Sequence, residues 1–203
     1  MVAAFCAAPV YAGDIGTPYK PISAGPAASS PAPAADVKAD QALLDKARAL
    51  RDSLEDLLRK SRDVSDDLDG MRSGVRRIKD KRDDGLELRI CDRNLRMRNT
   101  AESVVDVADA LKSLAGSAVA DYDLRCIASD INDDAVKLYR LYDGEIVPGA
   151  EGLYSDVDGL GDALMGDAAR AAVISLRSKA RDIGRSTEDI KDAAGKFYDA
   201  TRD

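Results

Sequence analysis

The chain has 203 residues, which is enough for one domain with a terminal extension. Its 37 acidic and 30 basic residues leave a net charge of −7, which argues against a general nucleic-acid-binding surface. The chain contains no histidine, which excludes Ser-His-Asp and Cys-His catalysis and every metal site that needs imidazole.

The first twelve residues have the character of an export signal. Residues 1–12 are almost wholly apolar, and Val10-Tyr11-Ala12 before Gly13 has the small-residue pattern of a signal-peptidase site. The positively charged region that precedes such a stretch is missing, so we interpret residues 1–12 as a signal-peptide remnant whose natural start lies upstream. We therefore expect a periplasmic or extracellular protein. The alternative is the apolar tail of a cytosolic protein.

Residues 13–35 form a Pro/Ala-rich linker. Six of the seven prolines lie within the first 36 residues, mixed with Ala, Gly and Ser. Such a composition cannot bury a core and favours extended, solvated chain, so we expect a disordered arm. No later stretch approaches the ~20 apolar residues of a membrane-spanning helix, which predicts no integral membrane segment after signal removal.

The remaining residues, 36–203, have apolar spacings of three and four that predict an all-α antiparallel bundle of three or four long helices. The first helix is expected from Asp36 or Asp40 to about Asp84. Its apolar seam comprises Leu43, Ala47, Leu50, Leu54, Leu57, Ser61, Val64, Leu68, Met71, Val75 and Ile78. Ser61 is the one polar residue of this seam.

The middle of the chain allows two architectures. One seam runs through Ile90, Asn94, Met97, Ala101, Val104, Ala108, Leu111 and Ala115, and another through Leu124, Ile127, Ile131, Ala135, Leu138 and Tyr142. If Gly116 does not break the chain, residues 88–143 form one helix of a three-helix bundle. If it does, Ser117 starts a further helix and the bundle has four. Alternating Leu86, Leu88 and Ile90 also allow a short β-hairpin, but we favour helix with a break.

A loop is expected at residues 144–154, because Pro148, Gly149 and Gly152 lie there. Ser155 and Asp158 would form the capping box of the last helix. The seam of that helix comprises Val173, Leu176, Ala180, Ile183, Thr187, Ile190, Ala194 and Phe197. Its phase slips near Gly161 and Gly166, which indicates a bend or break there.

If Cys6 leaves with the signal, Cys91 and Cys126 remain as a pair. In an exported chain this pattern favours a disulfide, which would require the middle of the chain to fold back. The alternative is two unpaired thiols packed as small apolar groups.

Charge is unevenly distributed along the chain. Residues 72–98 contain ten bases and five acids, and the surroundings of residues 143–167 are acidic. In an antiparallel bundle these segments meet at one end, where they could neutralise each other or present patches to partners. A run of charges is most often a solvated face, and we favour that interpretation. The candidate interaction patch consists of Arg72, Arg76, Arg77, Arg89, Arg93, Arg96 and Arg98.

The acidic segment partly matches a calcium-binding loop. Asp156, Asp158, Gly161 and Asp167 fall at positions 1, 3, 6 and 12 of such a loop. Leu160 at position 5 has no side-chain oxygen, and an acidic helix start explains the same residues. We therefore expect no metal, no cofactor and no catalytic residues.

These features favour an exported helical bundle that acts through protein–protein contacts, as a structural or adaptor component of the cell envelope. Its partner would be another protein or a second copy, with no role for nucleic acid. The alternative function is that of a periplasmic inhibitor or holdase-type chaperone. An enzyme is the least favoured class.

Overall fold

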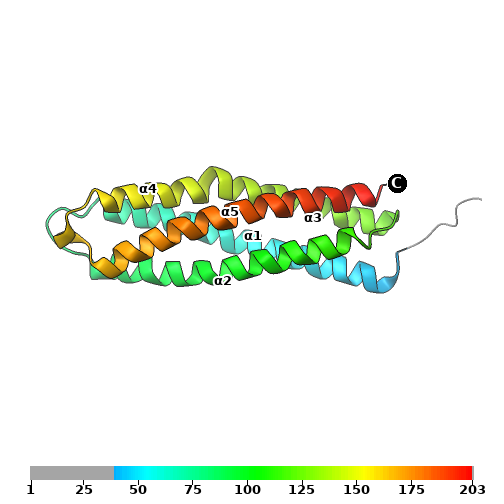
Figure 1. Ribbon diagram of the computed structural model, residues 1–203, viewed down its shortest axis with the longest axis horizontal. Helices are drawn as coiled ribbons and strands as arrows, with labels where there is room; N and C mark the ends of the chain where they lie inside the picture. Colours follow the sequence, from blue (N-terminus) through cyan, green and yellow to red (C-terminus); the bar gives the residue numbers. More distant parts are fainter. Residues whose placement is uncertain (1–38, 203) are drawn as a thin grey trace, which may run out of the picture. The chain divides into compact units, whose positions relative to one another are not determined.

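The computed structural model describes residues 39–202. Within this range the fold is an all-α helical bundle without β-strands, as the apolar seams predict (Figure 1). The predicted signal-peptide remnant at residues 1–12 and the linker at 13–35 lie outside the described residues.

Four helical rods make up the bundle. The first two are helices α1 (Gln41–Val75) and α2 (Asp84–Ala115). The third consists of α3 (Tyr122–Leu141), a π-helical turn η1 (Tyr142–Ile146) and α4 (Val147–Asp158), which follow one another without a break. The last is α5 (Asp167–Ala200), preceded by a 3₁₀ turn η2 (Asp162–Leu164).

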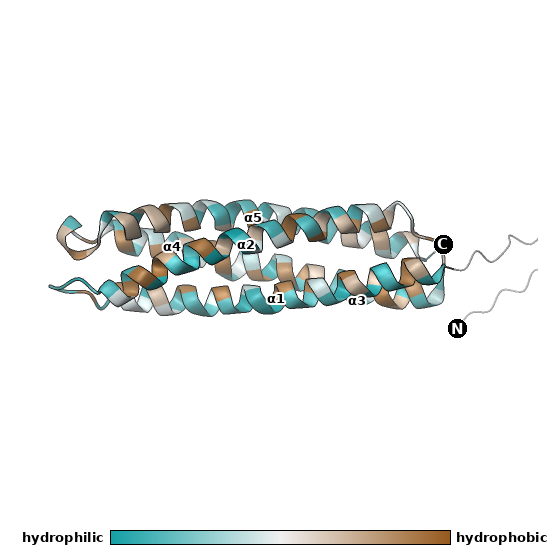
Figure 2. Ribbon diagram, turned by 90° about the horizontal axis from the view of Figure 1, so that it is seen from below, coloured by the Kyte–Doolittle hydropathy of each residue, from teal (hydrophilic) through white to brown (hydrophobic). Residues whose placement is uncertain are grey.

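The rods alternate in direction along the chain, so α1 runs parallel to the third rod and α2 runs parallel to α5 (Figure 1). Helix α2 packs mainly on α1 and α5, and the third rod also packs mainly on α1 and α5. Consecutive rods α2 and α3 are therefore not main packing partners, and α2 crosses the bundle obliquely (Figure 2).

The predicted seams form the core. Nearly all their apolar residues are buried, and the seams of α3 and α5 are buried throughout. Burial of apolar surface at about 25 cal/mol per Å² supplies the main driving force for this assembly.

Two polar seam residues join neighbouring helices. The Ser61 hydroxyl donates to the Tyr142 hydroxyl at 3.5 Å inside the core. Lys179 of α5 donates to the backbone and side-chain oxygens of Asn94 at 2.8 and 2.9 Å. Buried polar groups that find partners in this way avoid most of the cost of leaving water.

Aspartates cap three helices. Asp40, Asp83 and Asp121 each accept a hydrogen bond from a backbone amide three residues ahead. Asp40 was predicted as a cap, whereas the predictions that α1 reaches Asp84 and that Ser117 starts a helix were wrong. The break at Gly116 is confirmed, since Gly116 is the C-cap of α2 and the next helix begins after Asp121.

The loop predicted at residues 144–154 is helical instead. A proline inside an α-helix clashes with the carbonyl four residues back and cannot donate to it. Here the turn before Pro148 is π-helical, and the Val147 amide donates to the Tyr142 carbonyl five residues back. The wider turn lets the rod continue past Pro148.

The glycines of that segment serve close packing within α4. A side chain at Gly152 would overlap the Arg72 guanidinium, and a Cβ at Gly149 would touch Leu68 at 3.5 Å. The capping box predicted from Ser155 and Asp158 was also wrong, because both lie inside α4 and α5 begins only after Gly166.

Candidate functional site

The seven arginines of the candidate interaction patch all have partners within the chain. Arg72 and Arg76 bind Asp156 of α4 at 3.3 and 3.0 Å. The others bind as follows: Arg89 and Arg93 to Asp67, Arg96 to Asp92, Arg98 to Glu102, and Arg77 to the Ser73 carbonyl. Of the seven, Arg72 and Arg76 bind the acidic segment, whereas the others bind partners on α1 and α2.

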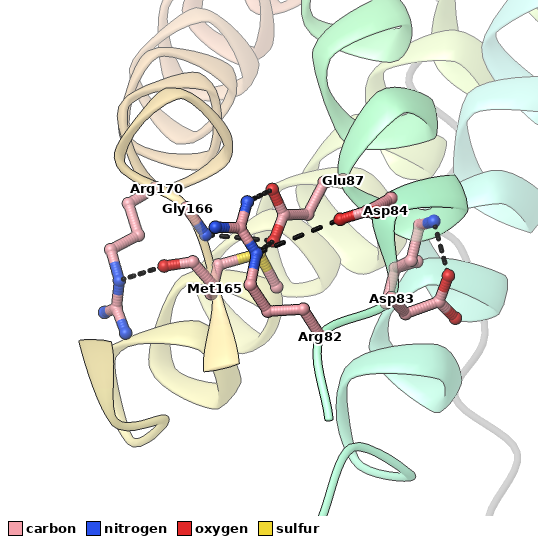
Figure 3. Close-up of polar contacts among 8 residues, drawn as sticks. Arg82, Asp83, Asp84, Glu87, Met165, Gly166 and Arg170 are labelled. Atoms are coloured by element: carbon pink, nitrogen blue, oxygen red, sulfur yellow. Dashed lines mark hydrogen bonds and ion pairs between the residues drawn. The ribbon is translucent and has the colours of Figure 1, made fainter. Parts of the chain in front are cut away.

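A second charged cluster closes this end. The Glu87 carboxylate accepts hydrogen bonds from Arg82 at 2.9 and 2.6 Å and from the Gly166 amide at 2.9 Å (Figure 3). The bonds from Arg82 and from the Gly166 amide hold the pKa of Glu87 below its usual value, against the opposing effect of burial. Arg170 donates to the carbonyls of Val157, Leu160 and Met165. These contacts join helix ends and explain the cluster without a ligand.

The predicted disulfide between Cys91 and Cys126 is absent, since both thiols are free. Cys91 lies near the start of α2 and Cys126 near the start of α3, which follows the far end of α2. At about 1.5 Å per residue the two positions are separated by about 30 Å along the bundle. A bridge needs Cα atoms within about 7 Å, so this prediction was wrong although the chain break it required is present.

The acidic residues of the calcium-loop match do not surround a common point. Asp156 and Asp158 belong to the end of α4, Asp162 to η2, and Asp167 to the start of α5. Asp156 is engaged by Arg72 and Arg76. Across residues 39–202, no group of three or more acidic or cysteine side chains is placed to hold a metal ion.

An open groove of about 570 Å³ lies between α1 and α2. Its floor consists of Leu50, Leu57, Val107 and Leu114, which are 2–6 % exposed. Its walls carry the small residues Ala49, Ser53, Ser103, Ala110 and Ser113, and its rim carries Lys46, Asp56, Lys60 and Asp106. We call this feature the α1–α2 groove.

The α1–α2 groove suits an elongated apolar guest. Small residues on both walls permit a close approach of another chain, while the leucines and valine below them offer an apolar contact. Of the four rim residues, Lys60 and Asp56 form an ion pair with each other, with Nζ and Oδ2 2.6 Å apart.

Among residues 39–202, exposed large hydrophobic residues are few, and most lie on α2. Leu88, Leu95 and Val105 of α2 are 72, 67 and 53 % exposed, and Tyr122 and Ile174 lie on other helices. The apolar seam of α2 passes through Ile90 and Met97, and the sequence-based prediction did not assign Leu88 and Leu95 to the surface. Their separation of seven residues, out of phase with the seam, is the signal that could have placed them outside.

Comparison of the chain with protein-family models, with curated proteins and with solved structures gives no match. None of the helices in the described part of the chain is long and apolar enough to cross a membrane. Any assignment of function therefore depends on the surfaces described above.

Proposed function

We propose that the protein is exported and acts through protein–protein contacts, as a structural or adaptor component of the cell envelope. The observation that carries the contact role is the α1–α2 groove, with its apolar floor, small-residue walls and charged rim. The proposal of export is supported by the apolar residues 1–12 and the cleavage pattern at Val10-Tyr11-Ala12.

A holdase-type chaperone or an inhibitor is the alternative. A holdase needs a large exposed apolar surface for unfolded clients. The large hydrophobic residues exposed in the described range are scattered over α2, α3 and α5, and the floor of the groove is mostly buried. This distribution favours a specific partner over general capture of unfolded chains.

The test combines cell fractionation with site-specific photocrosslinking in intact cells. A photoreactive amino acid replaces Ala110, an exposed residue of the groove wall, and in a matched control it replaces Asp189, an exposed residue of α5 outside the groove. We expect the chain in the envelope fraction, and a discrete adduct from position 110 but not from position 189. A cytoplasmic chain would overturn export, and equal crosslinking from both positions would overturn the groove as a contact surface.

A further inference from the structure

The α1–α2 groove runs between two uninterrupted helices that lie antiparallel (Figure 1). On α1 its lining extends from Lys46 to Lys60, a distance of about 21 Å along the helix. On α2 the lining extends from Ser103 to Leu114. The groove therefore has the length of about two heptads of a helix.

The floor of the groove alternates between the two helices. The Leu86 side chain lies against Gly74, and this contact sets the register of α2 on α1. Continued along both helices, the register places Leu114 about level with Lys46, and Val107 about level with Ser53. The order of the floor residues is then Leu114, Leu50, Val107 and Leu57. Their steps correspond to about four, three and four residues of α1, which is the apolar spacing of one face of a helix.

The walls of the groove are suited to close contact. The Ser53 hydroxyl donates to the Ala49 carbonyl at 2.9 Å, and the Ser103 hydroxyl donates to the Asn99 carbonyl at 3.1 Å. Because these donors are satisfied within their own helices, a guest can cover them without leaving them unpaired. The small side chains of the walls, Ala110 included, leave room for larger apolar side chains of the guest.

The main chain of the groove decides which conformation the guest can have. Along the groove the amides and carbonyls of Gln41–Val75 and Asp84–Ala115 bond within each helix. An extended segment would find no main-chain partners there, and covering its own amides and carbonyls would cost free energy. A helical guest satisfies these groups internally.

We propose that the α1–α2 groove binds an amphipathic helix of a partner protein, about two heptads long, with its apolar face on the floor. This inference rests on the proposed contact function and states the chemistry of the partner. The apolar side chains of the guest helix pack between the walls, and its polar face stays in water.

The rim assigns two charges to the guest helix. Asp56 and Lys60 form an ion pair, whereas within residues 39–202 neither Lys46 nor Asp106 has a charged partner. In the register above, Lys46 and Asp106 are about 12 Å apart along the bundle, which is about two helical turns. An acidic side chain of the guest beside Lys46 and a basic side chain two turns away beside Asp106 complete the electrostatic match.

The first test measures the conformation of the guest by photocrosslinking in intact cells. A photoreactive amino acid replaces Ser103 in one variant and Ser113 in another, at sites about 15 Å apart along α2. Mass spectrometry of the digested adducts identifies the modified residue of the partner in each case. A helical guest is expected to be modified at two residues about ten positions apart. An extended guest, at about 3.3 Å per residue, would be modified at residues about four or five positions apart.

The second test exchanges the two rim charges. Lys46→Glu/Asp106→Lys should lower the yield of the adduct from position 110 at least about 10-fold, because each charge of the guest then meets a like charge. The matched control is Lys196→Glu/Asp189→Lys, since both residues are exposed on α5 outside the groove and lie seven positions apart. The control should keep the wild-type yield. Circular dichroism confirms that both variants remain helical.

The outcomes separate the helical guest from the contact function itself. Adducts with a partner protein whose modified residues lie about four or five positions apart would overturn the helix and leave the contact function standing. So would equal yields from the two charge-exchange variants. An adduct between two copies of the chain would overturn a separate partner. If positions 103, 110 and 113 all give no adduct, the contact function and the helical guest both fail.

Discussion

The hydroxyl of Ser61 donates a hydrogen bond to the hydroxyl of Tyr142 across the core, at 3.5 Å, and both residues are fully buried. Tyr142 begins the π-helical turn η1 that carries the third rod past Pro148. The one polar residue in the seam of α1 is thus matched to the largest polar side chain of the core.

Tyr142 is expected to make the bundle sensitive to alkali. Burial raises the pKa of Tyr142 to about 12, against an ordinary value of 10.0. The unfolded chain therefore loses the hydroxyl proton of Tyr142 at a lower pH than the folded chain does. The contribution of Tyr142 to the free energy of unfolding is complete below pH 10 and is lost as the pH rises toward 12. Urea unfolding at pH 8 and pH 11 should show a smaller loss of stability for Tyr142→Phe than for the wild type. An equal loss in both would show that other groups cause the alkaline sensitivity.

Glu87 is expected to contribute to stability at neutral pH and to lose that contribution in acid. Its hydrogen bonds from Arg82 and from the Gly166 amide lower its pKa. The contribution is therefore complete above the ordinary glutamate pKa of about 4.3 and is lost as the pH falls through the lower pKa of the folded state. Glu87→Gln should lower the urea midpoint at pH 7, with a smaller difference from the wild type at pH 3.

The matched control for this prediction is Glu188→Gln, since Glu188 is an exposed residue of α5. The control should leave the midpoint unchanged at both values of pH. If Glu87→Gln lowers the urea midpoint as much at pH 3 as at pH 7, the electrostatic explanation is contradicted.

Two glycines of the third rod should respond differently to alanine. Gly144 has no atom within 4 Å of an added Cβ, whereas a Cβ at Gly152 would overlap the Arg72 guanidinium. Alanine gains up to about 1 kcal/mol over glycine in a helix. Gly144→Ala should raise the free energy of unfolding by about 0.5 kcal/mol. Gly152→Ala should raise the free energy of unfolding by less than this or should lower it, because the Arg72 side chain must leave Asp156.

Chemical unfolding of the two variants and of Gly152→Ala/Arg72→Ala checks this prediction. Arg72→Ala removes the guanidinium that an added Cβ at position 152 would overlap. The double variant should therefore be more stable than Arg72→Ala alone. An equal gain at Gly144 and Gly152 in the wild-type background would show that Arg72 moves aside without cost.

The two cysteines of the bundle should react as independent free thiols. Cys126 is exposed on α3, whereas Cys91 is partly buried against the core. Alkylation of the native protein followed by peptide mass spectrometry should modify Cys126 faster than Cys91. Reductant should leave the melting temperature unchanged. Two observations together would contradict the unbridged geometry. One is an intact mass that is two hydrogens too low and returns to the expected value with reductant, and the other is a peptide that links Cys91 to Cys126.

The sequence by itself determined the helical class of the fold and the buried faces of its seams. Seam residues such as Leu54, Ile131 and Leu176 repeat with the helical period, and that local pattern is enough to identify the side that avoids water. The cap at Asp40 was likewise predicted, because capping depends on residues only a few positions apart. The break at Gly116 was one of two alternatives, and it was favoured for a disulfide that the structure does not contain.

Only the tertiary structure decided the remaining features, because each depends on residues distant in sequence. Gly152 resembles a helix breaker until Arg72 is seen packed over it, and Ser61 resembles a seam defect until Tyr142 lies opposite. The basic segment resembles a docking patch until Asp67 and Asp156 neutralise much of it. The α1–α2 groove and the separation of Cys91 from Cys126 follow from the placement of whole helices, which seam periodicity alone does not specify.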